Sequence, residues 1–239
     1  MLYGNLSCAR IEPTLQHTAT VIFCHGLGDC GENVLELFRS ISFSTPNVRY
    51  LFPNAPVRPV TCNGGARMSA WYDIHQLMPG TTSIASQQDE EGILRSRELL
   101  LSVIRQESSL SPGRIVLGGF SQGAAIALAA GLSPIVNDRI GGIFCWSGYL
   151  PIHQTLLKNA DSGTAEFKEG TRKVTDTLIH FYHGTSDPLI PVALAEKSVD
   201  LLKMSHFSNV FLSKYKGLQH SFCEEELVDV AKFIKEILR

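Results

Sequence analysis

The sequence lacks the features that mark several large classes of protein. No apolar run reaches the length that a helix needs to cross a bilayer, and Met1 to Arg10 do not combine a basic segment with an apolar one, so neither a membrane span nor a secretion signal is expected. The net charge of -2 offers nucleic acid no electrostatic attraction. There is also no internal repeat and no low-complexity tract. The composition therefore predicts an ordinary globular protein without a nucleic-acid partner.

The histidines and cysteines lack the spacing of a metal site or a disulfide framework. None of the six cysteines forms a Cys-x-x-Cys pair, and Cys24 and Cys145 lie in apolar runs, where a thiol acts as a small core side chain. His180 and His183 are three residues apart on an expected strand, so they point to opposite faces and cannot readily share a metal ion. We expect no metal and a reducing, cytoplasmic location.

Apolar strand-like runs alternate with helix-like stretches along the chain. A strand is expected at 19–24, 48–52, 140–146, 178–182 and 210–215, and another runs from Ile115 into the Gly-rich turn before an Ala-rich helix. Further helices are expected at 33–43, at 86–108 with Ser86 as its cap, and at 224–238. This alternation predicts one α/β domain over residues 1–239, with a mostly parallel central sheet flanked by helices on both faces.

Two segments differ from this pattern. From Pro53 to about Ser83 the chain is rich in Pro, Gly and Asn but carries Trp71 and Tyr72, and a long loop with apolar side chains inside a compact domain is usually functional. Residues 154–176 are polar and highly charged. They could bind a partner, but the composition favours a solvated surface excursion, which is what we expect.

The segment Gly119 to Gly123 has the pattern of a nucleophile elbow. Its glycines permit a tight reversal between strand and helix, so Ser121 can stand clear at the carboxyl end of the strand, where its hydroxyl can attack an acyl carbon. A short Gly-x-Ser-x-Gly match can also be an ordinary Gly-rich turn. The flanking strand and helix favour the nucleophile.

A serine nucleophile needs a base and an acid, and both follow in the chain. An imidazole must take the proton of the hydroxyl, and a carboxylate must orient that imidazole. Asp187 and His220 each follow an expected strand and give the order Ser, Asp, His of α/β-hydrolases. Taken alone, Asp187 before Pro188 could start a turn or cap a helix, and His220 could be a solvated histidine.

The oxyanion of the tetrahedral intermediate needs two fixed donors. The backbone amide of Gln122, directly after the nucleophile, is one candidate. The amide of Leu27 is the other, since Gly26 and Gly28 allow the loop after the first strand to turn inward. We expect His25 to order this loop rather than to act as the base. The alternative interpretation of the segment His25-Gly-Leu-Gly-Asp29 is a plain Gly-rich turn that provides no oxyanion donor.

Several motifs together resemble the acyl-protein thioesterase and lysophospholipase group of α/β-hydrolases, the phospholipase/carboxylesterase family, from about Thr20 to Arg239. They are His25-Gly-Leu-Gly-Asp29, Phe52-Pro-Asn-Ala-Pro56, Asn63-Gly-Gly65, Trp71-Tyr-Asp73, Gly118-Gly-Phe-Ser-Gln-Gly123, Leu150-Pro151, His183-Gly184, Asp187-Pro188 and His220-Ser221. Together they are far more specific than the elbow alone. Ala124 stands where the family commonly has Gly, and Tyr149 stands where it commonly has Trp, so we expect these two residues to alter packing near the nucleophile.

The resemblance implies a function and assigns the site. Ser121, Asp187 and His220 become the triad, the amides of Leu27 and Gln122 become the oxyanion hole, and the loop from Trp71 to Pro79, with Leu77 and Met78, helps to shape a groove for an acyl chain. The implied reaction is hydrolysis of S-acyl thioesters on proteins, or of lysophospholipid esters, without a cofactor. Peripheral membrane contact would then come through the substrate, and a weak homodimer could form through Leu77 and Met78.

The sequence leaves three alternatives to a protein thioesterase. A general carboxylesterase or lysophospholipase would use the same triad. A non-catalytic binding protein on this fold is disfavoured because every triad position is filled. A serine peptidase is the most distant alternative.

Overall fold

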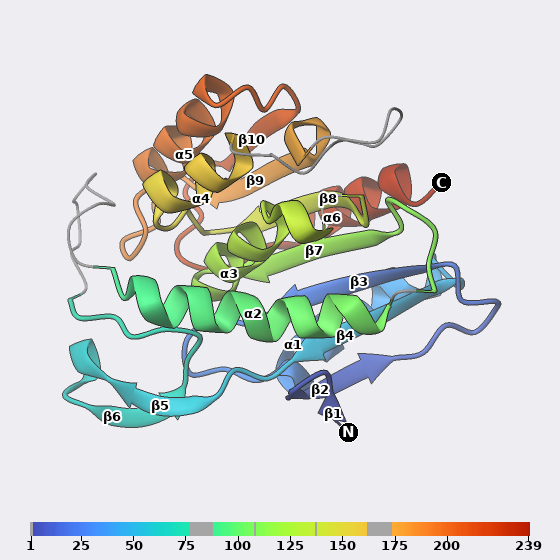
Figure 1. Ribbon diagram of the computed structural model, residues 1–239, viewed down its shortest axis with the longest axis horizontal. Coiled ribbons are helices and arrows are strands. Elements are labelled where there is room, and N and C mark those ends of the chain that lie inside the picture. Colours follow the sequence, from blue (N-terminus) through green and yellow to red (C-terminus); the bar gives the residue numbers. More distant parts are fainter. Residues whose placement is uncertain (1, 77–87, 108, 137, 162–173) are drawn as a thin grey trace.

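The strand-like runs assemble into one sheet that organises the molecule. The computed structural model describes residues 2–76, 88–107, 109–136, 138–161 and 174–239 (Figure 1). In this part of the chain the sheet has eight strands in the order β1-β2-β4-β3-β7-β8-β9-β10. They are β1 (Leu2–Tyr3), β2 (Leu6–Ile11), β3 (Ala19–Cys24), β4 (Val48–Pro53), β7 (Ile115–Phe120), β8 (Ile140–Trp146), β9 (Leu178–Gly184) and β10 (Val210–Tyr215).

The centre of the sheet is parallel, as the alternation of elements predicts. β3 pairs in parallel with both β4 and β7, and β7, β8, β9 and β10 continue in parallel. Every residue of β3 and of β8 is buried, as expected for strands that are covered on both faces. β2 was not expected from the sequence, and it pairs antiparallel with β4. The chain thus has the predicted fold class, an α/β-hydrolase architecture.

Helices cover both faces of the sheet (Figure 1). The apolar sides of α1 (Gly31–Phe43) and α6 (Glu224–Ile237) pack on one face, around Phe38 and Phe233. The opposite face is covered by α2 (Glu90–Gln106), α3 (Gln122–Gly131), α4 (His153–Asp161) and α5 (Val192–Met204). All ten residues of α3 are buried, which explains why this helix is apolar all round.

The segment from Pro53 and the start of the second helix differ from their expected structure. The segment from Pro53, which was expected to be a loop, contains a β-hairpin. Its strands, β5 (Val57–Val60) and β6 (Ala66–Ser69), pair with each other as a separate two-stranded sheet. α2 begins at Glu90, and its cap is Asp89, whose side chain accepts from the Gly92 amide; the expected cap, Ser86, lies outside the described residues. Short 3-10 helices occur at Thr61–Asn63, Pro134–Val136 and Val174–Asp176.

The polar segment at 154–176 is not a loop throughout, because its first part belongs to α4. This helix buries Leu156 and Leu157 against the core, so the two apolar residues fix it despite the polar composition around them. Residues 162–173 lie outside the described part of the chain.

Candidate active site

Ser121 occupies a sharp turn between β7 and α3. Its backbone has φ 54° and ψ -118°, a region that non-glycine residues rarely adopt, and its amide donates to the Trp146 carbonyl over 2.8 Å. A Cβ on Gly119 would collide with the backbone of Gly123, and a Cβ on Gly123 would collide with the Cys24 carbonyl. The turn therefore requires both glycines, and the strain at Ser121 is of the kind found where a side chain must be presented.

Residues from three loops meet at this turn. His220 Nε2 lies 2.9 Å from Ser121 Oγ, and His220 Nδ1 lies 2.7 Å from Asp187 Oδ2. Ser121 follows β7, Asp187 follows β9, and His220 follows β10. The side chains of Ser121, His220 and Asp187, which the sequence predicts as a triad, thus form a continuous chain of hydrogen bonds. His220 and Ser121 meet although they are 99 residues apart in sequence. With a proton on Nδ1, the imidazole donates to the carboxylate and can accept the hydroxyl proton at Nε2.

Asp187 is held as a carboxylate by its surroundings. Its side chain is fully buried, which by itself raises the pKa, but hydrogen bonds from His183 and His220 and from the Ile190 amide outweigh burial and hold the pKa of Asp187 well below its usual range. Oδ1 accepts from the amides of Leu189 and Ile190, each at 2.9 Å, which leaves Oδ2 to face the imidazole. The aspartate is therefore charged and fixed in position.

Leu27 and Gln122, the expected oxyanion donors, lie in the loop after β3 and at the start of α3. Neither amide donates to an acceptor within the described part of the chain, whereas the neighbouring Gly28 amide donates to the Ser69 carbonyl over 2.8 Å. Gly28 has φ 76°, a conformation that favours glycine, so the loop turns just after Leu27. Both amides are free to donate, and their role as an oxyanion hole stays a prediction.

Side chains tie the loop after β3 to the elbow. The Gln122 side chain accepts from the Trp71 amide and donates to the Tyr72 carbonyl, both over 2.7 Å. The Trp71 indole donates to the His25 carbonyl over 2.9 Å, and His25 Nε2 accepts from the Ala55 amide over 3.1 Å. As expected, His25 orders its own loop.

The expected acyl-groove residues can be described only in part. Trp71 is fully buried in the core and holds two backbone segments together. Leu77 and Met78 lie outside the described residues, so the groove stays a prediction. Beside Trp71, the Tyr72 hydroxyl lies 3.4 Å from that of Tyr149.

Two residues at the site were not assigned a role from the sequence. His183 Nε2 donates to the Ile190 carbonyl over 2.8 Å and lies 3.4 Å from Asp187 Oδ2. The Phe120 ring packs against the His220 imidazole, with centroids 4.9 Å apart. The motif His183-Gly184 at the end of β9 could have marked His183 as a residue near the site. No pattern in the sequence marks Phe120, because its contact joins distant loops.

The described residues contain no group of three or more His, Cys, Asp or Glu side chains that could hold a metal ion. None of the helices in the described ranges is long and apolar enough to span a bilayer. All six cysteines lie in the described part of the chain and are free thiols.

Comparisons with known proteins agree along nearly the whole chain. A family model described as phospholipase/carboxylesterase matches residues 7–238. Acyl-protein thioesterase 1 of Yarrowia lipolytica is 37% identical over 235 residues, 96% of each chain, and that of Candida albicans is 37% identical over 226 residues, 92% of each. The crystal structure of Zea mays acyl-protein thioesterase 2 matches with a TM-score of 0.81 at 27% identity, covering 98% of this chain and 99% of that one. Arabidopsis thaliana SOBER1 matches with a TM-score of 0.78 at 28% identity, covering 93% and 100%.

Proposed function

Because this chain belongs to the phospholipase/carboxylesterase family and is a serine hydrolase of the esterase and thioesterase type, we propose that it removes S-acyl groups from proteins through an acyl-enzyme on Ser121. The observation that carries the proposal is the hydrogen-bonded chain from Ser121 through His220 to Asp187, with links of 2.9 Å and 2.7 Å. Such a chain allows a hydroxyl to lose its proton as it attacks.

In the first half of the reaction Ser121 Oγ attacks the thioester carbonyl carbon while His220 takes its proton. Asp187, already charged, stabilises the imidazolium that forms. The amides of Leu27 and Gln122 donate to the oxygen that becomes negative, and because they are fixed in the backbone they need no reorganisation. The intermediate collapses, the C–S bond breaks, and the cysteine thiolate leaves with the proton that His220 carries.

In the second half a water molecule attacks the acyl-enzyme. His220 now takes a proton from water, a second tetrahedral intermediate forms at the same donors, and Ser121 recovers its proton as the fatty acid leaves. Cleavage of a thioester asks little of His220 as an acid, since a cysteine thiol has a pKa of about 8.5 and its thiolate is a good leaving group. The site thus suits thioesters and oxygen esters better than amides.

S-acylated proteins are the substrates that we infer, because the relatives from Yarrowia lipolytica and Candida albicans bear the name acyl-protein thioesterase 1. The acyl chain would lie toward Trp71, in the groove to which Leu77 and Met78 are expected to contribute. Six free thiols suit a reducing, cytoplasmic location, where S-acylated proteins would be met at membrane surfaces. A weak homodimer through Leu77 and Met78 and single-domain behaviour over 1–239 also stay proposals.

The decisive test replaces the nucleophile. Ser121→Ala should abolish turnover of an S-palmitoylated peptide and labelling by a fluorophosphonate probe, while Ser40→Ala, at an exposed serine on α1, should keep both. Continued labelling and turnover by the Ser121→Ala variant would refute the acyl-enzyme.

A lysophospholipase or general carboxylesterase remains the alternative, since the same triad would serve it. Rates on matched thioesters and oxygen esters across acyl-chain length, together with a lysolipid, separate the two functions. Fastest turnover of long-chain S-acyl peptides supports the proposal, and faster turnover of lysolipid or short esters supports the alternative. Faster cleavage of peptide amides than of thioesters would point to a peptidase.

A further inference from the structure

The side chain of His183 is fully buried beside the triad, although it is none of the three triad members. It lies near the end of β9, four residues before Asp187. Its Nε2 lies 2.8 Å from the carbonyl oxygen of Ile190, which can only accept, so this nitrogen carries a proton and donates. The same nitrogen lies 3.4 Å from Asp187 Oδ2. One N–H of the ring therefore faces both the catalytic carboxylate and the backbone that follows it.

The other ring nitrogen of His183 indicates that the residue does more than fill space. Nδ1 is buried and has no hydrogen-bond partner among the described residues. A buried polar atom without a partner costs free energy, and a phenylalanine ring would occupy the same space without that cost. The donor at Nε2 is therefore what distinguishes histidine from phenylalanine at this position.

The Nε2–H of His183 holds the turn that carries Asp187. Ile190 accepts from His183 through its carbonyl and donates through its amide to Asp187 Oδ1 over 2.9 Å. The Leu189 amide donates to the same oxygen, also over 2.9 Å. Rotation of the carboxylate would break both amide bonds, so Oδ2 stays directed at His220 Nδ1, 2.7 Å away.

The loop that carries His220 rests on the same segment of chain. The Ser186 amide donates to the Leu218 carbonyl over 3.0 Å. A Cβ on Gly184 would collide with that carbonyl oxygen, so the two segments meet closely at a glycine. The segment from Gly184 to Asp187 therefore carries one polar member of the triad and supports the loop of the other.

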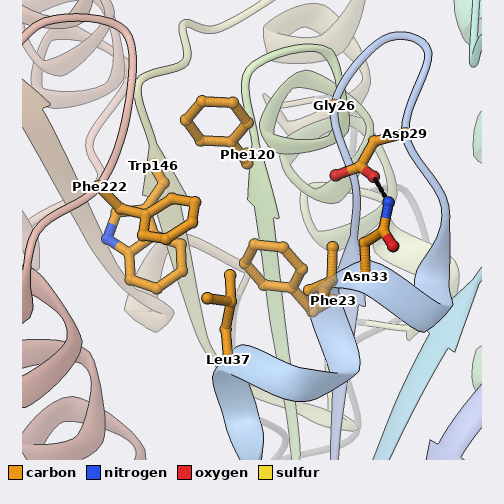
Figure 2. Close-up of a pocket in the computed structure, with 9 residues that line it drawn as sticks. Phe23, Gly26, Asp29, Asn33, Leu37, Phe120, Trp146 and Phe222 are labelled. Carbon is orange, nitrogen blue, oxygen red and sulfur yellow. Dashed lines mark hydrogen bonds between the residues drawn. The ribbon is translucent and has the colours of Figure 1, made fainter.

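Aromatic packing also touches His220, but it cannot direct the ring nitrogens. The Phe120 ring lies 4.9 Å from the imidazole, centroid to centroid, at 41°. Figure 2 shows Phe120 at the edge of a pocket, with Phe222 lying against Trp146. Burial of apolar surface is not directional, whereas a hydrogen bond is. The direction of the imidazole therefore depends on Asp187.

Two imidazoles face the Asp187 carboxylate, His183 from β9 and His220 from the loop after β10. Burial raises the pKa of Asp187, but the donors on these two rings and the Ile190 amide outweigh burial and keep the pKa low. Loss of the His183 donor would make the carboxylate more basic, so it would stabilise the imidazolium of His220 more strongly. The neutral imidazole that accepts the Ser121 proton would then need a higher pH.

We propose that His183 is a positioning residue of this hydrolase, which holds the turn from Asp187 to Ile190 so that Oδ2 stays directed at His220. This inference rests on the proposed acyl-enzyme mechanism, in which His220 takes the proton of Ser121. His183 acts through Asp187 and does not touch the substrate.

Two variants of His183 in the full-length protein test the donor. His183→Gln keeps an N–H that can reach the Ile190 carbonyl, so kcat on a neutral ester should stay within about 3-fold of the wild type. His183→Phe keeps a ring but no donor, so kcat should fall by about 10-fold to 100-fold with little change in KM. In His183→Phe the pH at which kcat/KM falls to half its plateau on the acid side should rise by about half a unit.

His180→Phe is the matched control, because it makes the same change on the same strand. His180 and His183 point to opposite faces of the sheet. His180 Nε2 lies 2.9 Å from Ser213 Oγ, and its ring packs against Phe233 of α6. This variant should keep both kcat and the acid side of the pH profile. Thermal unfolding verifies that each variant is folded.

A double variant separates a role through Asp187 from a general loss of structure. Asp187→Asn combined with His183→Phe should be no slower than Asp187→Asn alone, since the carboxylate that His183 positions is already absent. Losses that multiply would overturn the proposal. A folded His183→Phe variant with normal kcat, or one that unfolds at a lower temperature while the acid side of its pH profile stays unchanged, would also overturn it. Failure of the acyl-enzyme itself would appear in Ser121→Ala, which leaves His183 unchanged, so the two failures are distinguishable.

Discussion

The indole of Trp71 donates a hydrogen bond to the carbonyl oxygen of His25 over 2.9 Å. This bond joins the segment that follows β6 to the loop after β3, which carries Leu27. The Trp71 amide is held in turn by the side chain of Gln122, next to Ser121. One buried tryptophan therefore links the loop that carries Leu27 to the side chain of Gln122.

Trp71→Phe should weaken both the fold and catalysis. The His25 carbonyl would lose its donor in a buried place, which costs about 1–3 kcal/mol in the free energy of unfolding. A looser Leu27 amide would stabilise the oxyanion less, so kcat should fall while KM changes little. Urea unfolding and steady-state kinetics on a neutral ester measure the two effects.

Trp146→Phe is the matched control for the loss of stability. Trp146 is also fully buried, but its Nε1 has no hydrogen-bond partner among the described residues. The same substitution there removes packing without breaking a bond, so it should cost less than Trp71→Phe. Equal losses in the two variants would show that the bond to His25 contributes nothing.

Asp187→Asn should lower kcat by about 10³-fold to 10⁴-fold, because an amide can donate to His220 Nδ1 and then favours the wrong tautomer. The fold should change little, since the amide oxygen can still accept from the amides of Leu189 and Ile190. Single-turnover kinetics with a thioester measures the effect on acylation. Asp200→Asn, at an exposed position on α5, serves as the control, and a variant of Asp187 with near-normal kcat would contradict its role.

Glu226→Gln should stabilise the protein at neutral and alkaline pH. Burial raises the pKa of Glu226 from 4.5 to about 7, and its Oε1 has no partner in the described part of the chain. The folded state thus holds the proton more tightly than the unfolded state, so stability is fully present below pH 4.5 and is lost as pH rises toward 7. At pH 8 the variant should exceed the wild type by about 1 kcal/mol, a value reduced for solvent screening.

Urea unfolding of the wild type and Glu226→Gln at pH 4.5 and pH 8 measures this difference. Glu225→Gln, on the exposed side of the same helix, should show no comparable gain at pH 8. A gain of the same size at both pH values would mean that ionisation of Glu226 is not the cause.

Much of the architecture followed from local sequence alone. The boundaries of β3, β8 and β10 agree with the expected strands, since a continuous apolar run between turn residues has few other structures. The hairpin of β5 and β6 was missed because its residues pair within an otherwise irregular segment rich in Gly and Pro. α4 was missed because only two apolar residues anchor it.

The sequence by itself determined the candidate chemistry, because the glycines around Ser121 and the order of Ser121, Asp187 and His220 are written in the chain. Only the tertiary structure decided that these side chains meet at 2.9 Å and 2.7 Å and that His183 lies beside Asp187. The physical reason is that such contacts join residues far apart in sequence. Their distances depend on how the parallel strands align, and no local pattern records that alignment.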